Sequence, residues 1–140
     1  MKTDVIFSSK TDLWSTPQWL FDELNAEFHF DLDPCADDQN HQCAEYFTKE
    51  QDGLAQNWKG HTVFCNPPYG RIIGKWVEKC YRESLQDNTT LVMLVPARTD
   101  TKWFHEFVYD KAEIRFLRGR LRFGNATENA PFPSMIAVYR

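Results

Sequence analysis

Residues 62–96 read TVFCNPPYGRIIGKWVEKCYRESLQDNTTLVMLVP, and this stretch decides the fold. It begins with a short apolar run, Thr62 to Cys65, and after a turn continues into residues 71–86, where apolar side chains recur at helical spacing. It closes with Leu91 to Val95, a continuous apolar run of strand length that Pro96 stops. A strand, an amphipathic helix and a strand buried on both faces predict an α/β unit whose helix packs on a sheet.

Towards the N-terminus, Thr16 followed by Pro17 is typical of a helix start, an N-cap hydroxyl with proline at the first helical position. We expect a helix over residues 17–27. The run 28–33 alternates apolar and polar side chains and is stopped by Pro34, which predicts a strand ending at Asp33. Residues 46–48 indicate another short strand.

Towards the C-terminus, the pattern predicts a helix over residues 101–109 and strands over 112–117 and 135–139. Strands alternating with helices predict an α/β fold with a mostly parallel sheet flanked by helices. Ligands of such sheets bind beyond the carboxyl ends of the strands. Asp33 and Asn66 both fall at such ends, so we expect their side chains to converge.

The composition limits what the chain can be. A length of 140 residues with 42% hydrophobic and 15% aromatic content suits one domain over residues 1–140, with no room for a separate target-recognition domain. The first ten residues lack an apolar signal core, and no run approaches the ~20 apolar residues of a membrane span, so we expect a cytosolic protein. The four cysteines include no C-x-x-C pair, which argues against zinc and predicts reduced thiols, with Cys65 and Cys80 buried.

The loop Asn66-Pro67-Pro68-Tyr69 has the groups needed to methylate an amine on a conjugated ring, which is a poor nucleophile. The Asn66 side-chain carbonyl and the Pro67 backbone carbonyl can accept the amine hydrogens, while two prolines offer no competing N–H donor. Tyr69 can stack on an extruded base. The alternative is a plain strand-to-helix turn, which the same residues would also form well.

The charge is unevenly distributed. The net charge is −4, yet residues 115–123 carry four arginines with no acid between Glu113 and Glu128. A period-2 pattern predicts a strand or hairpin here, with an apolar face and a cationic face of Arg118, Arg120 and Arg122. We interpret the cationic face as a phosphate contact, the alternative being a sheet edge protected by charge. Further candidate phosphate contacts lie near the strand ends, namely Arg71, Lys75, Arg98 and Lys102.

The order of several motifs resembles one family. The motifs are Trp14 to Pro17, Asp33-Pro34-Cys35-Ala36, Asp52-Gly53-Leu54, Asn66 to Gly70, Pro96 to Thr99 and Pro131 to Ser134. Together they resemble the phage-type DNA N-6-adenine methyltransferases. The resemblance implies a compact class I, Rossmann-like methyltransferase that uses S-adenosylmethionine, no metal, and adenine in double-stranded DNA, in the host cytoplasm if phage-encoded.

The resemblance also implies residue roles. Asp33 would bind the methionine part of the donor, with Pro34, Cys35 and Ala36 as its wall. Asp52, beside Leu54, would contact the ribose or the adenine of the donor. Trp14, Thr16 and Pro17 would close over the donor, although Thr16-Pro17 is equally well explained as a helix cap. Asn66 would face both the donor and the base.

The expected mechanism is direct in-line transfer to the N6 amine of a flipped adenine, with alignment and exclusion of water supplying most of the catalysis. One rival is an N4-cytosine methyltransferase, whose amine poses the same electronic problem. Another is a catalytically silent DNA-binding module on a methyltransferase scaffold. The residues make no prediction of the oligomeric state.

Overall fold

The sheet is mixed. The computed structural model describes residues 14–140, in which four strands are ordered β1 (Thr62–Cys65), β2 (Thr90–Pro96), β4 (Ser134–Tyr139) and β3 (Glu113–Phe116) across one sheet. β1 and β2 are parallel, whereas β4 is antiparallel to both β2 and β3. The prediction of a mostly parallel sheet is therefore wrong. Residues 117–133, between β3 and β4, form no crossover helix, so β4 returns antiparallel beside β3.

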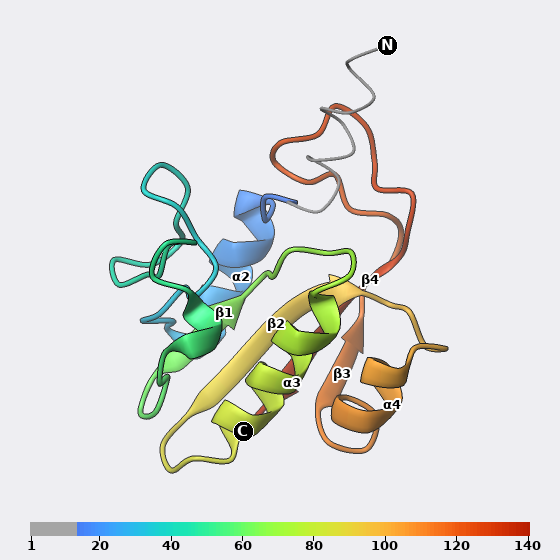
Figure 1. The fold of residues 1–140 in the computed structure, drawn as a ribbon. Coiled ribbons are helices and arrows are strands. Elements are labelled where there is room, and N and C mark those ends of the chain that lie inside the picture. Colours follow the sequence, from blue (N-terminus) through green and yellow to red (C-terminus); the bar gives the residue numbers. More distant parts are fainter. Residues whose placement is uncertain (1–13) are drawn as a thin grey trace.

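The strand directions still bring the expected ends together. Because β4 opposes both of its neighbours, β1, β2 and β3 run in one direction, towards the upper end of the molecule in Figure 1. The loop after β1 and the orange-red loop 117–133 both lie at this end. The carboxyl ends of the strands thus face the loops that carry the predicted site.

The helices confirm the sequence patterns to within two residues at each end. They are α2 (Gln18–Phe28), α3 (Ile73–Ser84) and α4 (Lys102–Phe107), with a 3-10 turn η1 (Gly53–Ala55). Phe64 of β1 packs edge-to-face on Phe21 of α2, and the next residue, Cys65, is hydrogen-bonded to Cys80 of α3. Since successive strand residues point to opposite faces, α2 and α3 cover opposite faces of the sheet.

The core follows the apolar runs. Every residue of β4 and all but the first of β2 are buried, as the continuous apolar pattern predicts for strands covered on both faces. Cys65 and Cys80 are buried free thiols, also as predicted. Among residues 14–140, no helix is both long enough and apolar enough to cross a bilayer.

The predicted strand over residues 28–33 is wrong. Helix α2 runs through Phe28 and ends at His29 in the left-handed region, and Pro34 follows soon after, so little chain remains for a strand. Leu32 and Asp33 make single parallel bridges, to Val63 and Tyr46. The short strand expected at residues 46–48 is likewise reduced to the bridge at Tyr46.

Candidate functional site

The Asn66 side chain lies just beyond the end of β1 with its amide held from one side. Its Nδ2 group donates to the Trp14 carbonyl and, at 2.9 Å, to the Thr16 hydroxyl. Its Oδ1 atom is buried and has no hydrogen-bond partner among residues 14–140. A buried acceptor without a donor costs free energy, so this oxygen is a ready acceptor for a ligand N–H.

Tyr69 is buried beneath three aromatic side chains. Its hydroxyl donates to the Leu94 carbonyl at 3.1 Å, and burial raises the pKa of the phenol, which keeps it a donor. Phe123 and Phe132 meet its ring edge-on, at centroid distances of 6.3 and 5.7 Å. Trp14 packs on both phenylalanines, at 5.2 and 5.3 Å. We call Trp14, Phe123 and Phe132 the aromatic lid, because together they cover the Tyr69 ring.

Asp33 is a buried carboxylate held by its own loop. Its two oxygens accept hydrogen bonds from the backbone N–H of Cys35 at 3.2 Å and of Gln42 at 2.9 Å. Burial nevertheless raises the pKa of Asp33, because desolvation outweighs these bonds. A bound cation would offset that desolvation and favour the ionised carboxylate.

Two motifs that are far apart in sequence touch at Gly53. A Cβ atom at Gly53 would lie 2.1 Å from the Pro34 carbonyl oxygen, so only glycine allows this backbone approach. The Trp58 indole N–H donates to the Gly53 carbonyl at 3.0 Å and fixes the turn. The predicted donor residues 33–36 and 52–54 are therefore brought together. The Asp52 carboxylate is exposed and accepts from the Leu54 N–H as the cap of η1.

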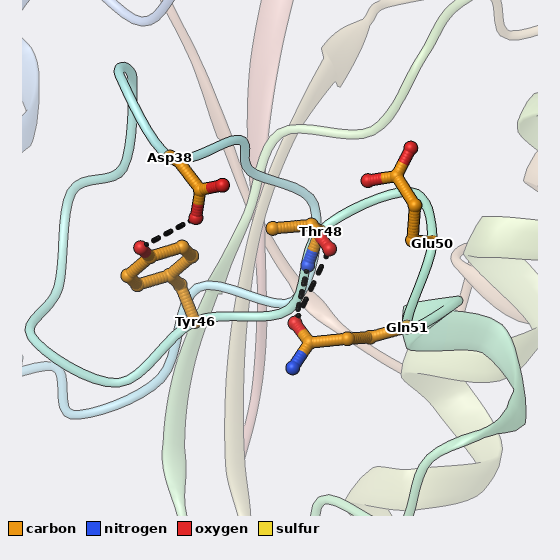
Figure 2. A pocket seen from close by; sticks show the side chains of 5 residues that line it. All are labelled: Asp38, Tyr46, Thr48, Glu50 and Gln51. Carbon is orange, nitrogen blue, oxygen red and sulfur yellow. Dashed lines mark hydrogen bonds between the residues drawn. The ribbon is translucent and has the colours of Figure 1, made fainter.

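A hollow of about 410 Å³ opens beside the loop that carries Asp33 (Figure 2). Its lining residues are Asp38, Tyr46, Thr48, Glu50 and Gln51. The Tyr46 hydroxyl donates to Asp38 at 2.9 Å, and Gln51 accepts from the Thr48 backbone at 2.8 Å. The Glu50 carboxylate lies across from these groups in Figure 2. The hollow includes neither Asp33 nor Asn66, but Tyr46 pairs directly with Asp33.

Sequence reasoning missed this hollow. The signal was present: Glu50 and Gln51 follow closely after the strand-like run 46–48, and Glu50 follows Asp33 at nearly the same spacing as Asp52. The bridge to Asp33 is what makes Tyr46 and its successors part of this end of the sheet.

Residues 14–17, which we call the N-terminal strap, lie on Asn66. Thr16 does not cap α2 as predicted, because the N-cap is Pro17 and no side chain caps the helix. The Thr16 hydroxyl instead accepts from Asn66. The strap thus contacts Asn66 directly through Trp14 and Thr16.

The arginine segment is not a strand or hairpin beyond Phe116, which corrects the prediction. β3 stops there because its partner strand β4 begins only at Ser134. The last backbone hydrogen bond between them runs from the Leu117 N–H to the Ser134 carbonyl. The two faces persist in the irregular chain: Leu121 and Phe123 are buried. The arginines on the other face are exposed and form no ion pair within residues 14–140, namely Arg118, Arg120 and Arg122.

The four other predicted phosphate contacts are all exposed but differ in their partners. Arg115, the first arginine of the segment, is not one of them: it is half-buried and pairs with Glu27 and Glu113, so its charge is compensated. Lys102 pairs with Glu106 at 3.9 Å. The Arg98 guanidinium lies 5.9 Å from the Phe132 ring of the aromatic lid. The other two, Arg71 and Lys75, form no ion pair within the described part of the chain.

The sequence is similar to those of known proteins over most of its length. A sequence model described as "DNA N-6-adenine-methyltransferase (Dam)" matches residues 4–137. The DNA N-6-adenine-methyltransferase of Haemophilus phage HP1 (strain HP1c1) is 33% identical over 139 residues, which are 94% of this chain and 80% of that protein.

Two shorter matches agree. The DNA N-6-adenine-methyltransferase of Escherichia phage T1 is 35% identical over 112 residues, 79% of this chain and 46% of that protein. The putative methyltransferase YfdM of Escherichia coli (strain K12) is 41% identical over 66 residues, 41% of this chain and 71% of that protein.

Proposed function

We propose that this chain, which belongs to the DNA N-6-adenine-methyltransferase (Dam) family, methylates an adenine held at Asn66 with S-adenosylmethionine held at Asp33. Family membership makes the chain a DNA adenine-N6 methyltransferase, and the donor and the residue roles are our proposal. The observation that carries these roles is the buried Oδ1 atom of Asn66, which has no hydrogen-bond partner within residues 14–140, just beyond β1. Asp33 lies beside the same strand, because its neighbour Leu32 pairs with Val63 of β1.

On the acceptor side, Asn66 Oδ1 and the Pro67 carbonyl accept the two hydrogens of the N6 amine. Neither proline supplies an N–H that would compete for the amine lone pair. No strong general base is required, because the amine proton becomes acidic once the carbon–nitrogen bond forms. Tyr69 stacks on the flipped base after the aromatic lid has opened, and the closed lid excludes water from the loop.

On the donor side, the residues fit a cationic amino acid. S-adenosylmethionine supplies a methyl group activated by its positive sulfur. The Asp33 carboxylate is buried, so its electrostatic attraction to the ammonium group of S-adenosylmethionine is stronger than that of an exposed acid. The contact between Gly53 and the Pro34 carbonyl keeps the wall of residues 34–36 close to residues 52–54.

The hollow suits the ribose of the donor. Carboxylates are the usual acceptors for a pair of sugar hydroxyls, and the hollow is lined by Asp38 and Glu50. We assign the ribose to Glu50 in preference to Asp52, because the Asp52 carboxylate already caps η1. Glu50→Gln is expected to weaken donor binding more than Asp52→Asn, as calorimetry would measure.

The DNA partner is double-stranded DNA, held by the exposed arginines Arg118, Arg120 and Arg122. Arg71, Lys75, Arg98 and Lys102 add contacts around the strand ends. Residues 1–140 belong to the methyltransferase catalytic domain. We place the reaction in the cytoplasm of the host cell, where both substrates occur.

The test is incubation of the purified protein with isotopically labelled donor and unmethylated DNA, followed by digestion to nucleosides. Label in N6-methyl-2′-deoxyadenosine that disappears in Asn66→Ala supports the proposal. Label in N4-methyl-2′-deoxycytidine identifies the rival enzyme. Donor binding without any labelled nucleoside identifies a silent DNA-binding module.

A further inference from the structure

We propose that Thr16 and the Trp14 carbonyl are a positioning device that fixes the Asn66 amide with its oxygen towards the acceptor amine. This inference rests on the proposed function, since it concerns how Asn66 is aligned. It moves Thr16 and Trp14 from the donor site to the acceptor site.

The hydrogen bonds decide which way the amide faces. The side-chain amide of asparagine has an NH2 group and a carbonyl oxygen of nearly equal size; the NH2 group donates hydrogen bonds and the oxygen accepts them. The Trp14 carbonyl can only accept, so it holds Nδ2 on its side of the amide. The Thr16 hydroxyl accepts the second Nδ2 hydrogen at 2.9 Å. Rotating the amide by half a turn would set Oδ1 against the Trp14 carbonyl and lose that bond. The Thr16 hydroxyl could then donate to Oδ1, so the Trp14 carbonyl decides which way the amide faces and Thr16 holds it in place.

The ordinary structural role of Thr16 is not fulfilled. A threonine before proline at the start of a helix normally caps the first turn. Here the N-cap is Pro17, and no side-chain oxygen caps α2. Thr16 is 8% exposed, and its side-chain hydrogen bond is to Asn66. The buried hydroxyl therefore serves the Asn66 amide.

The N-terminal strap is itself anchored. The Ser15 carbonyl accepts from Gly124 N–H at 2.8 Å, and Ser15 N–H donates to Asn125 Oδ1 at 3.1 Å. The Ser15 hydroxyl accepts from Asn40 at 3.0 Å. These contacts hold the strap between two loops, so the position of Thr16 is set by more than its own side chain.

The device also explains why residue 66 is an asparagine. A carboxylate at this position has no N–H, and one of its oxygens would face the Trp14 carbonyl at close range. Asn66→Asp is therefore expected to lose transfer about as strongly as Asn66→Ala. Full activity of Asn66→Asp would overturn the selection of an amide by the Trp14 carbonyl.

The central experiment compares Thr16→Val, which keeps the shape and removes the hydroxyl, with Thr16→Ser, which keeps the hydroxyl. We expect Thr16→Val to lower kcat about tenfold or more, because a small misplacement of a reacting group is costly, and to leave KM for donor and DNA within about twofold. Thr16→Ser restores kcat. Ser84→Ala, which removes a side-chain hydrogen bond at the C-terminal end of α3, outside the strap and the site, leaves kcat within about twofold.

A second readout does not depend on activity. In ¹⁵N-labelled protein, the Asn66 side-chain amide resonances are identified by their loss in Asn66→Ala. We expect Thr16→Val to move these resonances upfield, as removal of a hydrogen bond does, and Thr16→Ser to leave them in place.

The outcomes separate the two proposals. An inactive Asn66→Ala with a fully active Thr16→Val and unmoved amide resonances overturns the positioning role alone. A low kcat that Thr16→Ser does not restore assigns Thr16 a packing role and also overturns it. A fully active Asn66→Ala overturns the proposed function, whatever Thr16 does.

Discussion

The two halves of the site are held in different ways. The two hydrogen-bond donors to the Asp33 side chain lie two and nine residues away in the sequence, and both of its oxygens are bonded. The partners of the Asn66 side chain lie fifty and fifty-two residues away, and its oxygen is left open. The Asp33 carboxylate, in the proposed donor half, is therefore held within one segment, whereas the Asn66 amide, in the proposed acceptor half, is held only after distant segments have packed. We expect substitutions in the two halves to affect different kinetic constants.

The largest effect is expected from Asn66→Ala. Removing the oxygen that holds the amine should lower kcat by about 100- to 1000-fold, the usual cost of deleting one aligned polar group at a reacting centre. Donor affinity should stay within about threefold, because Asp33 and its loop are untouched. Single-turnover transfer and calorimetric donor binding measure the two constants.

The exposed Asn57→Ala is the control for Asn66→Ala, and it should leave both constants unchanged. If Asn66→Ala weakens donor binding as much as it slows transfer, the two halves are not separable and the comparison breaks.

Asp33→Ala should show the opposite profile. Loss of the buried carboxylate should weaken donor binding by about 2 kcal/mol, roughly thirtyfold, and leaves the Cys35 and Gln42 N–H groups without an acceptor. At saturating donor, transfer should largely recover. Calorimetry checks the affinity, and Asp22→Ala, an exposed acid on α2, controls for the change in net charge. Unchanged donor affinity in Asp33→Ala would remove Asp33 from the donor site.

A triple variant in which Arg118, Arg120 and Arg122 are each replaced by glutamine tests the proposed DNA contact, which lies outside both halves of the site. We expect DNA affinity to fall by about tenfold at moderate salt, and the slope of log affinity against log salt to shrink by about 0.9 for each phosphate that the variant no longer neutralises. Donor affinity should not change. Arg82→Gln is the matched control, because this exposed arginine lies at the far end of α3 and pairs with Glu78. A salt slope equal to that of the unmodified protein would show that the segment does not bind phosphates.

Near neutral pH, the smallest effect is expected from the titration of Asp33. Burial raises the pKa of Asp33, and the donor ammonium favours the ionised carboxylate. Donor affinity should therefore fall as pH falls through the raised pKa, starting at a higher pH than for an exposed aspartate. The decline should approach about tenfold per pH unit below that pKa. Asp33→Asn should flatten the profile between pH 4 and pH 7 (about the range between an ordinary Asp pKa and neutrality), and a wild-type profile that is already flat would contradict the assignment.

Sequence reasoning recovered the elements that local patterns specify. The helical spacing after Gly70 and the apolar run before Pro96 predicted α3 and β2, because side-chain periodicity follows directly from helix and strand geometry. It failed for residues 28–33, where α2 used one more residue than expected and left too few for a strand. The prediction of a mostly parallel sheet was wrong because the alternation of side chains along a strand does not indicate the direction in which β4 runs.

By itself, the sequence determined the loop chemistry: a carboxylate before Pro34, a carboxamide before two prolines, and a glycine at position 53. These depend on residue type and on backbone geometry over a few positions. Only the tertiary structure decided that the Thr16 hydroxyl turns to Asn66, that the aromatic lid covers Tyr69 and that Gly53 meets Pro34. The physical reason is that hydrogen bonds and ring contacts across fifty residues depend on how the segments pack, which no local pattern encodes.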